Sequence, residues 1–304
     1  MSALSLRPAS ALAGIALAVG AVACFATLDT TTKLTSMAGV PILMALWFRY
    51  CFQAVATSLM TLRQGRRVWH TRRPGLHLLR GLLLMGSSGT AFFSLKHLPV
   101  AEFTAIVSLT PLVITFLAAV VLRERVSVLR WLLVVGGFGG ALAIIRPGAE
   151  QFSAAMLLPL LVLAINTAFQ LLTSRMVKTE DPLTMHMYTG WVGTLLCALA
   201  LPWAWQALAP GDWALLLLMG ASATTGHLLL ILAYGRAPVA TLGPYLYAQI
   251  GFAVIGGWVA FAHTPDAWSL LGMGIIAACG AAGAWLTVRE NRSIQAALLQ
   301  PLEP

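Results

Sequence analysis

The sequence predicts an all-α membrane protein of ten transmembrane helices, arranged as two inverted five-helix repeats. Three observations predict this fold class. Hydrophobic residues make up 59% of the 304-residue chain and charged residues only 10%, whereas an ordinary soluble domain carries about 25% charged residues. Apolar runs long enough to cross a bilayer, which takes about 20 residues, occur ten times along the chain. These runs also fall into two sets of five with the same spacing.

The ten runs are bounded by charged residues, prolines or glycines. The first set covers residues 12–35, 41–62, 76–96, 99–122 and 127–146. The second set covers residues 153–175, 183–205, 213–234, 238–261 and 266–287. One shift of 139 residues carries each run of the first set onto a run of the second without a gap. We therefore divide the chain into a first half, residues 1–148, and a second half, residues 149–304.

Residue identity between the two halves is faint except at one place, where "LPVA" ending at Ala101 aligns with "APVA" ending at Ala240. The repeat is therefore one of hydropathy, and a chance match of evenly spaced runs is the alternative. Five is an odd number of spans, so a second repeat must lie upside down relative to the first. Inverted repeats are typical of secondary transporters, whose halves rock around a site near the bilayer midplane.

Lysine and arginine residues in the loops predict the orientation, because cytoplasmic loops carry an excess of them. With a cytoplasmic N-terminus, 15 of the 19 basic residues lie on the inner side, Arg80 among them, and two lie on the outer side. We therefore expect a multi-pass protein of the cytoplasmic (inner) membrane with both termini in the cytoplasm.

Several classes of function are disfavoured. The net charge of +9 is scattered between apolar runs, so no nucleic-acid partner is expected. The four cysteines, Cys24, Cys51, Cys197 and Cys279, lie in apolar runs without the paired spacing of a zinc site. No metal-ligand cluster and no phosphate-binding glycine loop occur, so no metal and no cofactor are expected. The expected partners are a small-molecule substrate and membrane lipid.

The stretch from Pro99 to Gly148 contains a mid-helix "TPL", an "LRER" exit and a closing "RPG". It resembles the signature region of the drug/metabolite transporter superfamily, in its ten-helix EamA-type exporter branch. "FATLDTTTKL" and "WFRY" are also typical of that branch, so the resemblance covers nearly the whole chain. One departure is "FAHTPD", with His263 where the family has an acid. The resemblance implies export of amino acids or related small metabolites, and no enzyme activity.

Four charged residues are expected in the outer half of the spans: Asp29, Lys33, Arg49 and Glu102. Charges inside a membrane are costly and usually mark a pathway, so they predict a polar vestibule or gate. The alternative is that they reach to the lipid headgroups. Asp29 and Lys33 are four residues apart and can pair on one helical face. The threonines between them can bond to the preceding turn, so we expect the helix to continue through "LDTTTKL".

Five polar residues are expected nearer the midplane: Asn166, Gln170, His227, Tyr247 and Gln249. His227 predicts either a proton relay, which would couple transport to protons, or a hydrogen bond between helices. Tyr247 and Gln249 are two residues apart and cannot share a helical face without local unwinding. Glu124, in "LRER", is expected to pair with neighbouring arginines or to serve an inner gate.

The repeat and the polar residues predict a secondary transporter that works by alternating access, and the resemblance implies that it exports amino acids or related small metabolites. Two alternatives stay open at this point. An intramembrane enzyme could use Glu102 and His227 as an acid–base pair, although helix rise places them about 15 to 20 Å apart, which is too far for direct proton transfer. An uptake permease of the same fold is equally compatible with the sequence.

Overall fold

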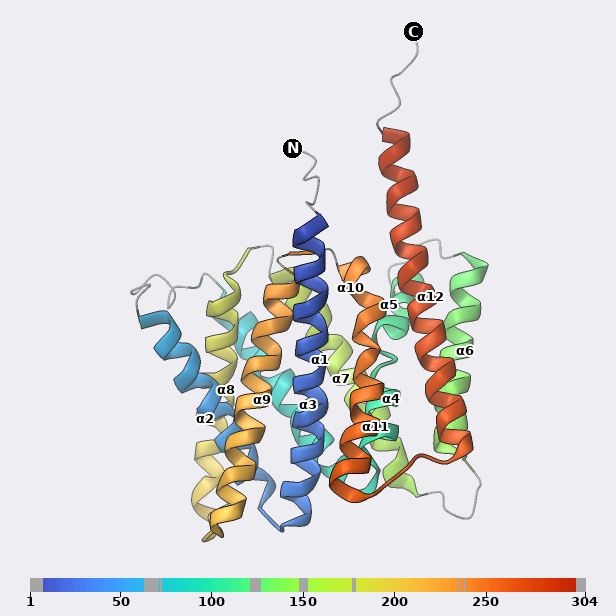
Figure 1. Ribbon diagram of the computed structural model, residues 1–304. Helices are drawn as coiled ribbons and strands as arrows, with labels where there is room; N and C mark the ends of the chain where they lie inside the picture. Colours follow the sequence, from blue (N-terminus) through green and yellow to red (C-terminus); the bar gives the residue numbers. More distant parts are fainter. Residues whose placement is uncertain are drawn as a thin grey trace.

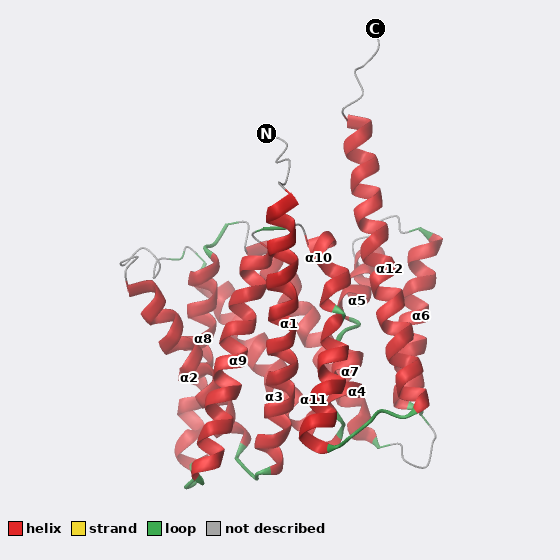
Figure 2. Cartoon of the chain, in the orientation of Figure 1, coloured by secondary structure: helices red, strands yellow, loops and turns green. Residues whose placement is uncertain are grey.

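The computed structural model describes residues 8–62, 71, 73–120, 127–147, 153–176, 179–234, 236–237 and 239–298. Every regular element in these ranges is a helix (Figure 2). Ten spans in the described part of the chain are long and apolar enough to cross a membrane. The predicted fold class is confirmed.

The first half contains helices α1 (Pro8–Met37), α2 (Ile42–Thr61), α3 (Pro74–His97), α4 (Val100–Val107), α5 (Thr110–Val120) and α6 (Val128–Ile145). The second half contains the short η2 (Ala154–Leu157), α7 (Leu158–Met176), α8 (Pro182–Ala204), α9 (Pro210–Tyr234), α10 (Val239–Leu246), α11 (Ala248–Phe261) and α12 (Ala267–Leu298). The bounds agree with the predicted runs to within a few residues, except that α12 continues well beyond 287.

Two of the predicted spans are broken near their middle. Helices α4 and α5 form one span that is interrupted at Ser108 and Leu109, and α10 and α11 form another that is interrupted at Tyr247. In the first of them Pro111 has no N–H to donate to the carbonyl of Val107. The hydroxyl of Thr110 bonds that carbonyl instead, at 2.8 Å. The break is therefore stabilised by a local side chain.

The bounds of the helices follow the 139-residue shift closely. Added to the bounds of α4, the shift gives 239–246, which are the bounds of α10. It also carries the break at Ser108 onto Tyr247, and the first residue of α6 onto the first residue of α12. The prolines are not equivalent, since Pro111 follows one break and Pro244 precedes the other. The position of the break therefore repeats even though its proline does not.

Both termini lie at the same end of the bundle (Figure 1). We call this end the terminal face and the opposite end the distal face. Helices α1, α3, α6, α8 and the α10–α11 span run from the terminal to the distal face, and the other spans run back. Each span therefore runs opposite to its equivalent in the other half, which is consistent with an inverted repeat.

The main helix pairs join one half to the other. Helix α1 packs on α9, α2 on α8, α3 on α7, and α6 on α12. In the repeat α1 corresponds to α7 and α3 to α9, so the α1–α9 pair is equivalent to the α3–α7 pair. The α2–α8 and α6–α12 pairs each join two equivalent helices. Helices α6 and α12 approach closely at Gly140 and Gly272, where a Cβ on Gly140 would lie 2.8 Å from the carbonyl oxygen of Gly272.

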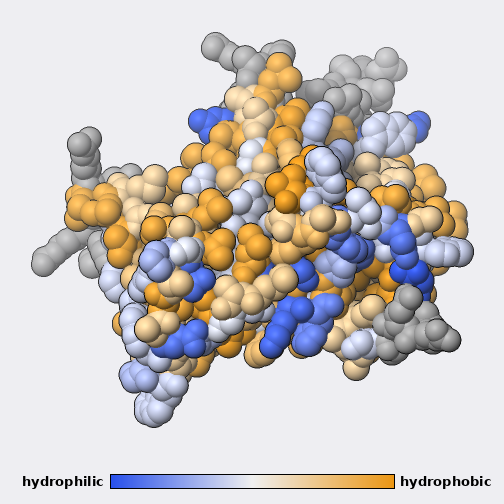
Figure 3. Space-filling model, turned by 60° about the horizontal axis from the view of Figure 1, so that its bottom comes forward, coloured by the Kyte–Doolittle hydropathy of each residue, from blue (hydrophilic) through white to orange (hydrophobic). Residues whose placement is uncertain are grey.

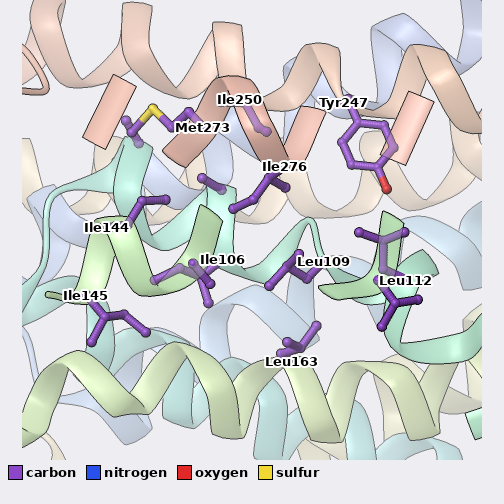
Figure 4. Close-up of a cluster of buried hydrophobic side chains, with 14 residues drawn as sticks. Ile106, Leu109, Leu112, Ile144, Ile145, Leu163, Tyr247, Ile250, Met273 and Ile276 are labelled. Atoms are coloured by element: carbon purple, nitrogen blue, oxygen red, sulfur yellow. The ribbon is translucent and has the colours of Figure 1, made fainter. Parts of the chain in front are cut away.

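A hydrophobic cluster surrounds the break between α4 and α5 (Figure 4). Leu109 at the break is fully buried. Side chains from α6, α7, α11 and α12 pack around it, among them Ile144, Leu163, Ile250 and Ile276. This cluster fixes the break, and with it the polar groups that lie beside it.

Candidate functional site

Helix α1 continues through "LDTTTKL", as predicted. The hydroxyls of Thr30, Thr31 and Thr32 donate to carbonyls four residues earlier, at 2.9, 2.8 and 2.7 Å. These bonds satisfy the hydroxyls within the helix, so three polar residues in a row do not end it.

Asp29 lies between the two broken spans. Its Oδ2 accepts a hydrogen bond from Thr104 Oγ1 of α4 at 3.0 Å and one from Gln249 Nε2 of α11 at 3.4 Å. Thr104 precedes the first break and Gln249 directly follows the second. One carboxylate of α1 is therefore in contact with both interrupted spans.

Asn166 of α7 occupies a related position in the second half. Its Nδ2 donates to Thr110 Oγ1 at 3.3 Å. Thr110 and Gln249 are equivalent under the 139-residue shift, and each lies just after a break. The first long helix of each half therefore places a polar side chain against the same position of a broken span, and only Asp29 of the two is charged.

Arg49 supplies a buried positive charge on α2, where it is only 5% exposed. Its guanidinium donates to Ser88 Oγ and, at 3.4 Å, to the hydroxyl of Tyr50. The Nε of Arg49 is buried and has no partner. Arg49 and Asp29 form no ion pair with each other. The site therefore holds an acid and a base with hydrogen-bonding capacity left over.

The expected pair between Asp29 and Lys33 is wrong. The Nζ of Lys33 donates to the carbonyl oxygens of Leu95 and Leu98, at 2.8 and 2.6 Å, and lies 5.6 Å from the centre of the Phe261 ring. Carbonyls at the end of α3 have no partner within the helix and attract a positive charge. The longer lysine reaches them, while Asp29 turns to Thr104 and Gln249.

Glu102 forms its contact with another residue, and the vestibule or gate expected of the four outer charges stays a prediction. Its Oε1 is 3.2 Å from Nε2 of His263, the residue that departs from the family pattern. Both line a cavity of about 190 Å³ on the distal side, together with Arg146 and Asp266. Figure 3 turns this face forward and shows polar side chains among apolar ones over it.

His227 of α9 lies among rings and makes no hydrogen bond to any described residue. Its ring centre is 4.9 Å from that of Phe25 and 6.5 Å from that of Phe169. It contacts neither Glu102 nor a charged partner at hydrogen-bonding distance, so the expected proton relay and the acid–base pair receive no support from the described contacts. Gln170 is half-buried, and the described residues offer it no hydrogen bond.

Tyr247 and Gln249 face different surroundings, because the helix is interrupted at Tyr247. The Tyr247 ring packs on Gly280 of α12, where a Cβ would overlap it, and its buried hydroxyl has no partner. Of the two residues only Gln249 reaches Asp29. Glu124 lies outside the described residues.

Sequence reasoning missed a second polar layer nearer the terminal face. Arg80, counted among the inner-side charges, is 3% exposed and donates to the carbonyl of Met185 and to the hydroxyls of Thr173 and Thr189. Beside it, Gln53 Nε2 donates to the carbonyl of His186 at 2.9 Å. Because Arg80 lies close to a basic loop, its role inside the bundle could not be recognised from the sequence. No spacing in the sequence connects it with α8.

The described residues contain no group of three potential metal ligands. What they bring together is a separated acid and base, amides, hydroxyls and aromatic rings in the interior of a helical bundle. Such groups have the chemistry to bind a polar solute.

Comparison with known proteins shows which family the chain resembles. Residues 12–146 match the EamA-like transporter family. A riboflavin transporter of Vibrio cholerae is 30% identical over 69% of this chain and 72% of its own. An S-adenosylmethionine uptake transporter of Rickettsia bellii is 27% identical over 76% and 79%, and a pseudopaline exporter of Pseudomonas aeruginosa is 26% identical over 88% and 94%.

A solved crystal structure shares the fold with a TM-score of 0.64, at 18% identity over 93% of this chain and 99% of its own. The overall fold is therefore shared with a known structure. The chain is a multi-pass membrane protein of the EamA-like transporter family, within the drug/metabolite transporter superfamily, and its relatives carry small metabolites.

Proposed function

We propose that this protein is a secondary transporter for metabolites that carry an amino-acid group, and that it works by alternating access between the halves 1–148 and 149–304. The observation that carries the solute class is the pair of unmatched charges, Asp29 and Arg49. Both lie inside membrane spans, and no ion pair joins them.

A zwitterionic group fits this arrangement. Its ammonium would bind the Asp29 carboxylate, and its carboxylate would bind the guanidinium of Arg49, whose buried Nε has no partner. Hydrogen bonds to charged groups are stronger than neutral ones. The rings of Phe25 and Phe169 would face the rest of the solute.

The names of the relatives cover both directions of transport. Outward movement, expected from the family resemblance, stays a prediction, and the Rickettsia relative makes uptake the second candidate. In a secondary transporter the gradients of the solute and of any coupled ion set the direction. No charged group contacts His227 among the described residues, so proton coupling through it is not part of the proposal.

Reconstituted vesicles test the proposal. Labelled amino acids, S-adenosylmethionine and riboflavin would be offered from each side, with and without a pH gradient. We expect transport of the compounds with an amino-acid group, and loss of transport when their ammonium is removed or their carboxylate is converted to an amide. If riboflavin, which has no amino-acid group, were transported and the other compounds were not, the proposed class of solute would be wrong.

A further inference from the structure

Four ion pairs connect described residues, and each of them joins the first half to the second. His77–Glu180 and Arg130–Glu290 lie at the terminal face. His263–Glu102 and Arg146–Asp266 lie at the distal face. Each face of the bundle therefore has one pair that contains an arginine and one that contains a histidine.

The two arginine pairs hold the same two helices together. Arg130, in the first turn of α6, is 2.6 Å from Glu290 of α12, and Arg146, just after α6, is 2.6 Å from Asp266, just before α12. Between these ends the helices cross closely at Gly140 and Gly272. The backbone N–H of Ser269 donates to Asp266 and holds the pKa of that carboxyl below its usual range. Helices α6 and α12 are therefore joined at both ends by a pair of an arginine and a carboxylate.

The two histidine pairs are built differently. Each joins a helix end in the first half to a loop in the second, and each is charged on both sides only when the histidine is protonated. His77 of α3 reaches Glu180 in the α7–α8 loop at 3.3 Å, and Thr71 Oγ1 donates to the same carboxylate oxygen at 3.0 Å. Glu102 of α4 reaches His263 in the α11–α12 loop at 3.2 Å.

The distal pair stands beside a path to the interior. Its cavity extends from His263 and Asp266 to Ile106, which is fully buried one turn before the break in the α4–α5 span. The second oxygen of Glu102 is buried without a partner. A buried carboxylate that is satisfied on one side only gains hydration when the contact opens.

We propose that the two histidine contacts are the gates of the transporter. His263–Glu102 closes the distal face, His77–Glu180 closes the terminal face, and they open in turn while α6 and α12 stay together. This inference rests on alternating access, which is part of the proposed function. It adds the residues that close each side.

Thiol labelling measures the opening of each face without any solute. Two buried reporters, Ile106→Cys beside the distal gate and Met185→Cys in α8 near the terminal gate, would be made singly in a protein without its native cysteines. His263→Ala should raise the labelling rate of Ile106→Cys about tenfold and lower that of Met185→Cys. Glu180→Ala should do the reverse. Tenfold corresponds to about 1.4 kcal/mol, in the range of one hydrogen bond to a charged group.

The arginine pairs supply matched controls. Arg146→Gln and Glu290→Gln each break one pair, on the distal and the terminal face respectively, and should leave both labelling rates within about twofold. The reciprocal variants Glu102→Ala and His77→Ala should repeat the signs of their partners, which guards against a variant that fails to fold.

Opposite shifts from the two histidine pairs, with unchanged controls, support the gates. Equal shifts in the controls, no shift, or faster labelling of both reporters in the same variant overturns them. Absence of transport in the vesicle assay, with opposite shifts in labelling, would instead contradict the proposed solute and leave the gates in place.

Discussion

The two halves share one arrangement of five spans but differ in charge. The spans of the first half contain Asp29, Lys33, Arg49, Arg80 and Glu102. The equivalent positions under the 139-residue shift are Ala168, Leu172, Tyr188, Met219 and Thr241. None of these side chains is charged, so the repeat extends to the backbone and its breaks but not to the ionic groups. On the proposed function, the first half binds the charges of the solute and the second half adds neutral contacts.

The largest effect on transport is expected from Asp29→Asn. The amide keeps an oxygen for Thr104 and Gln249 but loses the charge that would bind an ammonium group. Transport should fall about 100-fold, or about 3 kcal/mol, while the yield and elution volume of the purified protein stay unchanged. Asp212→Asn, at the start of α9, is a control that should remain within about twofold. Full transport activity of Asp29→Asn would show that the charge of Asp29 does not bind the solute.

Arg49→Gln should lower transport about 30-fold, because a neutral amide replaces a buried guanidinium that faces the carboxylate of the solute. Competition by a solute and by its amide distinguishes the role of the charge. The wild type should prefer the carboxylate, and the variant should bind the two about equally. A preference that survives in Arg49→Gln would place the carboxylate elsewhere.

Smaller effects are expected from the second half. Gln249→Leu removes one long hydrogen bond to Asp29, of 3.4 Å, and Asn166→Leu removes one of 3.3 Å to the hydroxyl of Thr110. Each is worth about 1 kcal/mol, so the rate of transport should fall about fivefold. Gln170→Leu is the matched control on α7, because Gln170 bonds to none of the described residues, and it should stay within about twofold. If either of the first two variants lost as much as Asp29→Asn, the contrast between the halves would not hold.

The smallest effect on transport is expected from Lys33→Met. Its two hydrogen bonds to the end of α3 stabilise the fold, so the free energy of unfolding should drop by about 1 to 3 kcal/mol with transport within about twofold of wild type. Thermal unfolding in detergent measures the first quantity and vesicle uptake the second. The double variant with Asp29→Asn should be as inactive as Asp29→Asn alone. Recovery of transport in the double variant would instead indicate that Asp29 and Lys33 form an ion pair in the wild-type protein.

Hydropathy predicted the ten spans and the 139-residue shift, because lipid requires an apolar run of fixed length for every crossing. It did not predict the breaks at Ser108 and Tyr247, since their prolines lie at different distances from them. The spacing of Asp29 and Lys33 showed that they share a helix face, but not that the end of α3 offers Lys33 better partners. His263 was visible only as a departure from the family pattern, and its partner Glu102 is 161 residues away in the chain.

The pairing of helices across the halves also has a consequence for biosynthesis. When residues 1–148 have left the ribosome, α1, α2, α3 and α6 still lack their main neighbours, which are α9, α8, α7 and α12. Asp29 then has no Gln249, and Arg80 has no α8 carbonyl to bind. The newly made half must therefore keep its charged side chains in contact with the insertion machinery or with water until α8 and α11 have been synthesised. A chain that stops before α8 would leave both Arg80 and Asp29 without these partners inside the membrane.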